Sequence, residues 1–373
     1  MRRLRGLFDG DIQLDLLQFS ELHTAYFGIP GRTLDSVLSS SHRSSIDVKD
    51  AHGRTTLSWA AQRGDAGIVD RLLRCGADPN SSDSIGMNPL HWSLFADNST
   101  CMELLLDSKA DVGLKDVFGR TVLSFAAMRG DETTFVDILL EYGADIESQD
   151  IDSKRPLHTA TKENYHYMVA SLLERGADIN AKTLGGNTAF YLALFRNSHE
   201  VLRTLLDNAN LHYDVLREHG RTLLHYAALF ADIETLDILK SKHLNGLDST
   251  KVDRDGCTPK DDAQWRRDSN DNWARWAKNP RDLDTEEWYS AFEELLDSVD
   301  DAKCSRPETD VSEDDEDDDE DEDEDEDEDG DEDGDGDEDG DEDKDEDKDE
   351  DKNEVEDEEF WQDAPEQPVG VRA

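Results

Sequence analysis

The chain repeats one short pattern at a nearly constant interval, and this period limits the folds open to it. An apolar residue recurs at Leu57, Leu90, Leu123, Leu157, Phe190 and Leu224. The steps between these positions are 33, 33, 34, 33 and 34 residues. A second signature, Gly-Ala-Asp or a close variant, recurs with the same interval at 76–78, 109–111, 143–145 and 176–178, and decays to Ala209-Asn210. A period of this length is typical of stacked supersecondary units, each of which buries its apolar face against its neighbours.

One period, residues 50–82, predicts two short helices. Thr55 can cap the first helix, and Gly76 follows the last apolar position of the second, where a left-handed helix stop favours a residue without a Cβ atom. The apolar residues of the second helix fall at three- and four-residue steps, at Ile68, Val69, Leu72 and Leu73. Each helix would be about two turns long, which is too short to be stable alone in water. The unit therefore requires neighbours.

Proline at the first helical position supports this interpretation. It occurs in Asn88-Pro89-Leu90-His91, in Arg155-Pro156-Leu157-His158 and in Thr258-Pro259. Its missing N–H costs no hydrogen bond at such a position. Together with the period, these helix starts resemble the T-P-L-H-x-A pattern of ankyrin repeats. The resemblance covers about residues 16–267 and implies an all-α solenoid of helix-turn-helix units with β-turn fingers.

The resemblance also divides the chain. We expect a weakly structured leader at 1–15, a degenerate capping repeat at 16–49, six repeats over 50–252, a partial repeat with a helical cap at 253–299 and a disordered acidic tail at 300–373. The six repeats are predicted at about 50–82, 83–115, 116–149, 150–182, 183–216 and 217–252. In the cap, Trp265, Trp273 and Trp276 are expected to form an aromatic face. A last helix is predicted from Asp284, with an apolar stripe from Trp288 to Val299. This tryptophan-rich end is similar to that of some fungal ankyrin proteins.

Most of the charge lies in the tail. The net charge of the chain is −53, and residues 308–359 hold 40 Asp/Glu and 3 Lys, so that this segment carries −37 and the remainder −16. Such a segment has almost no apolar surface to offset the entropy of ordering, which predicts disorder. It matches the calcium-loop pattern of EF-hands in two overlapping frames, at 331–342 and 335–346. We attribute the matches to composition and expect no specific calcium site.

Several features indicate an intracellular protein. Four cysteines, Cys75, Cys101, Cys257 and Cys304, show no paired spacing, which favours a reducing compartment. The start lacks an apolar run of signal-peptide length, and no stretch approaches 18 consecutive apolar residues. We therefore expect a cytoplasmic or nuclear monomer that is neither secreted nor inserted in a membrane. The negative charge disfavours direct binding of DNA or RNA.

No motif in the sequence predicts catalysis. His91, His158 and His225 stand where the ankyrin family carries the T-P-L-H histidine, which by resemblance hydrogen-bonds the neighbouring turn. The aspartates that follow the helix-ending turn are interpreted as turn residues: Asp78, Asp111, Asp145 and Asp178. Phosphate-binding, zinc-protease and serine-hydrolase motifs are absent. We expect a protein that is not an enzyme and that has no catalytic residue, cofactor or metal.

In the ankyrin family, partners contact the turn before each first helix and the last turn of that helix. The predicted partner surface consists of apolar and positively charged or ionisable residues at the matching positions: Ile85, Phe95, Phe118, Arg120, Met128, Arg129, Leu184, Phe195, Arg196, His219 and Phe230. Aromatic and arginine side chains dominate interface energetics. Some of these rings could instead pack between the repeats.

We interpret the chain as a non-catalytic scaffold that binds a partner protein through the concave face and turn tips of the stack. The expected ligand is an acidic or extended segment, either of the partner or of the chain's own tail. The alternative is a chaperone-like role, in which the acidic tail binds basic proteins such as histones or ribosomal proteins and the repeats localise it. Salt separates the two, because high ionic strength screens exposed charges over a few ångströms.

Overall fold

The computed structural model describes residues within one compact unit, Met1–Pro307. The described residues are 18–28, 33–39, 46–96, 98–130, 133–213, 220–242, 244, 247–268 and 285–304. The predicted leader at 1–15 and the predicted tail from residue 305 onward lie outside this set. Trp273, Trp276 and His219 lie outside it as well, so the predictions made for them stay predictions.

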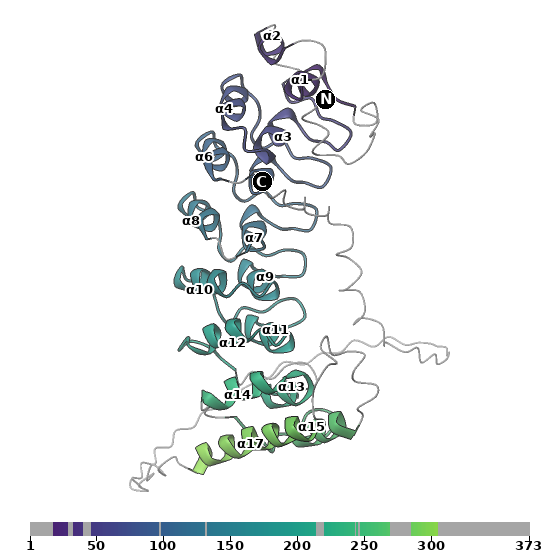
Figure 1. The fold of residues 1–373 in the computed structure, drawn as a ribbon, viewed down its shortest axis with the longest axis vertical. Coiled ribbons are helices and arrows are strands. Elements are labelled where there is room, and N and C mark those ends of the chain that lie inside the picture. Colours follow the sequence, from purple (N-terminus) through teal and green to yellow (C-terminus); the bar gives the residue numbers. More distant parts are fainter. Residues whose placement is uncertain are drawn as a thin grey trace, which may run out of the picture. The chain divides into compact units, whose positions relative to one another are not determined.

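The described residues form helices and no strands, apart from an isolated bridge between Lys115 and Thr121. The helices are α1 (Glu21–Tyr26), α2 (Leu34–Ser39), α3 (Thr56–Gln62), α4 (Ala66–Arg74), α5 (Pro89–Ser93), α6 (Thr100–Asp107), α7 (Val122–Ala126), α8 (Thr134–Glu141), α9 (Pro156–Lys162), α10 (His166–Glu174), α11 (Ala189–Phe195), α12 (His199–Leu206), α13 (Leu223–Phe230), α14 (Ile233–Ser241), α15 (Pro259–Asp268) and α17 (Thr285–Cys304). Figure 1 shows the helix pairs stacked one upon the next, with first helices such as α7, α9 and α11 in one column and second helices such as α8, α10 and α12 in another. The prediction of an all-α repeat solenoid is confirmed.

The recurring apolar residue of each first helix marks the core. It is nearly or completely buried in all six repeats, at Leu57, Leu90, Leu123, Leu157, Phe190 and Leu224. Residues of the second helices, such as Leu72, Leu105 and Leu139, are fully buried in the same continuous cluster. Because the cluster runs from pair to pair, each pair covers the apolar face of the next. The sequence period therefore reports the packing of the stack.

An aspartate closes the β-turn finger that precedes each first helix in most repeats. Oδ1 of this aspartate accepts backbone N–H bonds of 2.8–3.0 Å from the residues two and four positions later, at Asp50, Asp83, Asp116, Asp150 and Asp253. Neighbouring fingers are joined by N–H···O bonds of 2.8–3.0 Å, from Ser84 to His52, Val117 to Ile85, Ile151 to Phe118 and Leu184 to Asp152. The fingers therefore form a row along the stack.

Close approach between fingers explains two of the finger glycines. Gly53 and Gly86 have positive φ angles of 76° and 84°. A Cβ atom at these positions would lie 2.7 Å and 2.9 Å from backbone atoms of the next finger. Either substitution would force the fingers apart and strain the backbone. In the fourth finger Ser153 takes the same left-handed conformation, with φ of 56°.

Histidines of three first helices contact backbone carbonyl oxygens outside their own helix. Nε2 of His23, His158 and His225 lies 3.0–3.1 Å from the carbonyl oxygens of Arg54, Ala181 and Cys257. Arg54 and Cys257 belong to the repeat that follows, and Ala181 lies at the end of the same repeat as His158. For His158 and His225 this is the kind of turn contact that the resemblance implied, whereas Nε2 of His91 has no hydrogen-bond partner among the described residues. The aspartates of the helix-ending turns are confirmed as turn residues, because each accepts a backbone N–H from two residues later at Asp78, Asp111, Asp145 and Asp178.

A buried arginine fastens the C-terminal cap to the stack. Arg266 of α15 donates to the carbonyl oxygens of Ala228 (3.1 Å) and Ala231 (2.9 Å), and its guanidinium lies 4.0 Å from the ring centroid of Trp288 in α17. The indole of Trp288 donates to the same Ala231 oxygen at 2.9 Å. Burial lowers the pKa of Arg266 to about 10, against the opposing charge of Asp232. The sequence analysis did not predict a role for Arg266.

The cap differs in part from its prediction. Trp288, Phe292, Leu295, Leu296 and Val299 are buried, as the predicted stripe requires. Trp265, by contrast, is 54% exposed, so its assignment to a packed aromatic face is wrong. The neighbouring Arg266, with its long apolar stem, occupies the buried position instead. Helix α17 extends to Cys304, past residue 299. None of the described helices, α17 included, is long and apolar enough to cross a membrane.

Replacing Arg266 by alanine should loosen the cap. Arg266→Ala leaves two buried carbonyl oxygens without their charged donor and removes the surface that covers Trp288. We expect the free energy of unfolding to fall by about 2–4 kcal/mol, measured by denaturant titration. Arg254→Ala removes an exposed arginine of the preceding finger and should change it by less than about 0.5 kcal/mol. Equal effects of the two variants would contradict the role assigned to Arg266.

Buried histidines should make the fold sensitive to acid. Burial lowers the pKa of His91 and of His158 to about 4, from an ordinary value of 6.5. The unfolded chain therefore binds more protons than the folded chain between these values, and stability falls as the pH falls through this window. His158→Gln should reduce the loss of unfolding free energy between about pH 7 and pH 5 by up to about 2 kcal/mol. The exposed His212 provides the control, and His212→Gln should keep the slope of the parent.

Candidate protein-binding surface

Four successive fingers carry an exposed apolar side chain. Ile85, Val117, Ile151 and Leu184 are 43%, 57%, 63% and 76% exposed, and we name these four residues the finger row. In Figure 1 the fingers project from the column of first helices on the side away from the second helices. The hydrogen bonds between fingers hold the members of this row in register. The spacing of the finger row is therefore fixed by the backbone of the stack.

The finger residues that are exposed in the structure differ in part from those that the sequence analysis predicted. Ile85 and Leu184 are exposed as predicted, but Phe118 is only half-buried at the surface, because the guanidinium of Arg120 lies 4.8 Å from its ring centroid. Val117, beside it, is the exposed residue of that finger. Ile151 was also left out of the predicted set. In three of the four fingers, the exposed residue directly follows the finger aspartate or its threonine substitute, a signal that the sequence contained.

The ends of the first helices supply a second group of aromatic residues. Phe95 and Phe195 are 52% and 55% exposed, as the prediction requires. The ring of Phe195 lies 4.9 Å from that of the half-buried Phe230, so part of this pair packs between repeats. Met128 is half-buried as well. The alternative that some rings serve packing between repeats thus holds for part of the predicted set.

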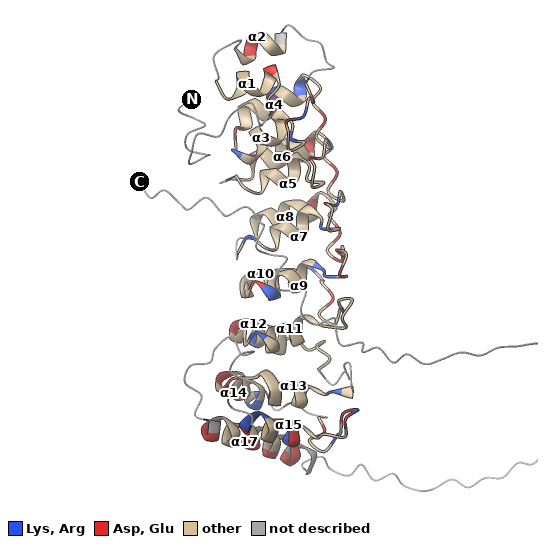
Figure 2. Ribbon diagram, turned by 90° about the vertical axis from the view of Figure 1, so that its right-hand side faces the viewer, with Lys and Arg blue, Asp and Glu red and all other residues tan. Residues whose placement is uncertain are grey.

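Most of the basic side chains at the fingers are compensated within the fingers. The Arg120 guanidinium donates to Asp116 Oδ2 at 2.7 and 2.9 Å. Other such pairs join Arg54 to Asp83, Lys154 to Asp152 and Arg221 to Asp253, with distances of 2.9–3.9 Å. Figure 2 shows the resulting mixture of blue and red along the finger side of the stack. The positive field expected for an acidic ligand is therefore weaker than the sequence suggested.

Two further arginines of the predicted set lie at the ends of first helices. Arg129 and Arg196 are exposed, and the guanidinium of Arg129 lies 5.0 Å from the ring centroid of Phe135. The surface is therefore mainly apolar and aromatic, with charge at its margin.

The helix-pair repeats of the structure agree with the similarity of this sequence to known proteins. The family model of ankyrin repeats in three copies matches residues 24–116 and 95–183. Residues 24–183 are therefore ankyrin repeats. Palmitoyltransferase AKR1 of Lachancea kluyveri is 38% identical over 123 residues, which are 31% of this chain and 17% of the relative. The protein of the same name from Kluyveromyces lactis is 42% identical over 100 residues, 26% of this chain and 13% of the relative.

A third relative has a different kind of name. The nuclear factor NF-kappa-B p105 subunit of Gallus gallus is 29% identical over 160 residues, 42% of this chain and 16% of the relative. The chain thus spans less than a fifth of the length of these relatives. Relatives with different names share the repeats with this chain. The match therefore identifies the repeats, and it does not assign the activity of any of these relatives to this chain.

The comparison overturns the prediction that the chain is not an enzyme. Relatives named palmitoyltransferase are enzymes, and they match at 38% and 42% identity. The matches cover the ankyrin region alone. The sequence argument failed because it searched for catalytic motifs in the repeats, whereas ankyrin repeats also occur as one part of proteins named as enzymes. No catalytic residue of this chain follows from the match.

The exposure of the finger row predicts how its members affect stability. Leu184→Ala should change the free energy of unfolding by less than about 0.5 kcal/mol, because the side chain is mostly in water in the folded state. Leu123→Ala, at a fully buried position of the same residue type, should cost about 2–5 kcal/mol. Denaturant unfolding of both variants measures the difference. A large loss for Leu184→Ala would mean that the finger row serves the stack itself.

Proposed function

We propose that the chain binds another protein through the finger row and the exposed ends of the first helices, and that this binding is the task of the repeats. Ankyrin repeats generally mediate contacts between proteins, which supports the class of ligand. The observation that carries the proposal is the finger row, with four apolar side chains exposed on consecutive fingers. Apolar side chains gathered on one side of a protein are a common mark of an interaction site.

The energetics favour an apolar ligand over a charged one. Covering a partly exposed Val or Leu side chain contributes about 1 kcal/mol, so the row and the two exposed phenylalanines can together supply most of a specific affinity. The finger arginines and lysine contribute less, because their charges already face carboxylates. A partner segment with apolar side chains, in an extended or helical conformation that follows the row, fits this surface best.

The tail supports a second candidate function. Residues 308–359 carry a net charge of −37. In the described part of the chain, α17 adds exposed acids, which are Glu286, Glu287, Glu294, Asp297, Asp300 and Asp301. Figure 2 shows α17 marked by acidic residues. A basic protein would bind such a segment through charge, and this binding would weaken steeply with salt.

One capture experiment separates the two candidates. The full-length chain, a Val117→Ser/Leu184→Ser variant and a Tyr167→Ser control are used as bait, and bound proteins are quantified at about 0.15 M and 0.3 M salt. Tyr167 is 64% exposed but lies on the second helix α10. Partners of the finger row should persist at the higher salt, lose affinity roughly 10- to 100-fold with the double variant and remain with the control.

The opposite pattern would refute the proposal. If every captured protein is released by salt and none responds to the double variant, the acidic segment carries the binding. If the control weakens binding as much as the double variant, the contact lies on the second helices. Both variants change exposed positions, so their folding is checked by the helical circular dichroism signal and is expected to match that of the parent.

A further inference from the structure

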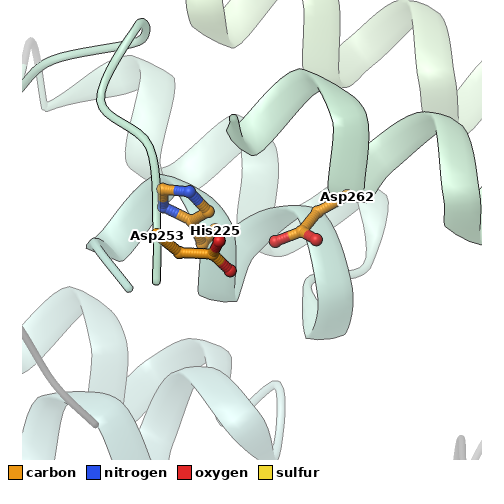
Figure 3. A group of neighbouring side chains, drawn as sticks. All are labelled: His225, Asp253 and Asp262. Atoms are coloured by element: carbon orange, nitrogen blue, oxygen red, sulfur yellow. The ribbon is translucent and has the colours of Figure 1, made fainter. Parts of the chain in front are cut away.

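Three buried ionisable side chains meet where the last finger joins the cap. His225 comes from α13, Asp253 from the finger that follows, and Asp262 from α15. One potential ligand atom of each lies within 4.8 Å of the others, and the residues are 0%, 6% and 7% exposed. Figure 3 shows the carboxyl group of Asp262 directed toward Asp253 and His225. We name these three residues the junction cluster.

The hydrogen bonds within the cluster define the state of two members. The backbone N–H of Thr222 points at His225 Nδ1 (3.1 Å), while Nε2 lies 3.0 Å from the carbonyl oxygen of Cys257. Nδ1 therefore holds the lone pair and Nε2 the proton, as in a neutral imidazole. Asp253 accepts two finger N–H bonds on Oδ1 and faces Arg221 Nε at 3.2 Å through Oδ2. Its charge is compensated.

Asp262 is not compensated in this way. Its Oδ2 is buried and has no hydrogen-bond partner among the described residues. A buried carboxylate without a partner must take up either a proton or a cation.

Comparison with the other repeats shows what the carboxylate replaces. The position of Asp262 in its first helix is that of Trp59 and Trp92 in earlier repeats. There the indole Nε1–H donates to Oδ2 of the repeat's own finger aspartate, at 2.8 Å to Asp50 and 2.9 Å to Asp83. In the last repeat the donor is replaced by a second carboxylate. The arrangement that remains has two facing carboxylates where the earlier repeats have a donor and an acceptor.

A second replacement in the last repeat also removes a group that could compensate the charge of a carboxylate. Four residues after the finger aspartate, three earlier repeats carry Arg54, Arg120 and Lys154, the repeat of Asp83 carries Met87, and the last repeat carries Cys257. At the position four residues after the aspartate, the last finger therefore has an uncharged side chain where the fingers of Asp50 and Asp116 have an arginine. Asp253 is instead paired with Arg221 of the preceding repeat, whose Nε donates to its Oδ2.

We propose that the junction cluster binds a divalent transition-metal ion of the Zn²⁺ type, with Asp262 and Asp253 as carboxylate ligands and His225 as the nitrogen ligand. Mixed nitrogen and oxygen ligands favour Zn²⁺ and its first-row neighbours, whereas Mg²⁺ and Ca²⁺ favour oxygen ligands alone. Both nitrogens of His225 are already hydrogen-bonded, so binding exchanges one of these bonds for a metal bond. The ion would join α13, the last finger and α15, and so fasten the cap to the repeats.

The sequence analysis gave His225 a structural role alone and expected no metal. That expectation rested on the absence of a ligand motif, and a motif search is blind to residues that are brought together from three elements. Asp253 and Asp262 are separated by nine positions and His225 by a further 28, a spacing that matches no short metal motif.

Two matched variants of the full-length chain test the proposal. Asp262→Asn keeps the shape of the side chain and removes its charge, while Asp255→Asn makes the same change at the exposed tip of the same finger. After treatment with a chelator, thermal unfolding is followed with Zn²⁺, with Mg²⁺ and without metal. We expect Zn²⁺ to raise the melting temperature of the parent and of Asp255→Asn, and Asp262→Asn to bind Zn²⁺ roughly tenfold or more weakly.

The comparison of variants removes the contribution of the acidic tail, which is identical in all three proteins. Equal Zn²⁺ responses in the three would mean diffuse binding and would overturn the site. So would a parent that Zn²⁺ does not stabilise but that Asp262→Asn makes more stable, because the cluster would then hold only a proton. Should Asp262→Asn fail to fold, the unaltered chain decides, since Co²⁺ bound here must give visible absorption bands that one equivalent of Zn²⁺ removes.

Discussion

The contact between successive helix pairs is the interaction on which the structure depends. Each pair has helices of 5 to 9 residues in the repeats, which are too short to persist alone, and the apolar face of each pair is covered by the next. The stack must therefore end in something that covers an apolar face on one side and tolerates water on the other. At the C-terminal end α15 and α17 do this, held by the contacts of Arg266 with two carbonyl oxygens and the ring of Trp288.

The fingers, like the helix pairs, depend on contacts with their neighbours for their conformation. An aspartate fixes the local conformation of each finger, and one N–H···O bond carries that conformation to the next. Because the backbone groups are satisfied in this way, the apolar side chain at the outer position has no role in closing the finger and is left in water. The exposed row is thus a consequence of how the fingers are built, and its chemistry sets the class of ligand.

Charge is used differently along the stack. In the middle repeats, arginine and lysine side chains neutralise finger aspartates and lie over aromatic rings, as Arg120 does between Asp116 and Phe125. In the last finger Cys257 takes the basic position and Asp262 takes the position of a tryptophan. The junction between repeats and cap therefore concentrates negative charge in a buried place, which is an unusual demand on a small protein unit.

The sequence by itself determined the repeat. The period of 33 to 34 residues located the buried apolar residue of each first helix. The turn contacts of His158 and His225 and the recurring turn aspartates were also predicted, because each depends on local or nearest-neighbour geometry that repeats with the chain. The tertiary structure decided which of two adjacent side chains faces water. Arg120 lies over the ring of Phe118, whereas Val117 beside it is exposed. Arg266 is buried in place of Trp265 because it meets carbonyl oxygens of α13 and its end. The junction cluster was also decided there, since His225, Asp253 and Asp262 come from three elements, and distances across elements are not encoded in a one-dimensional period.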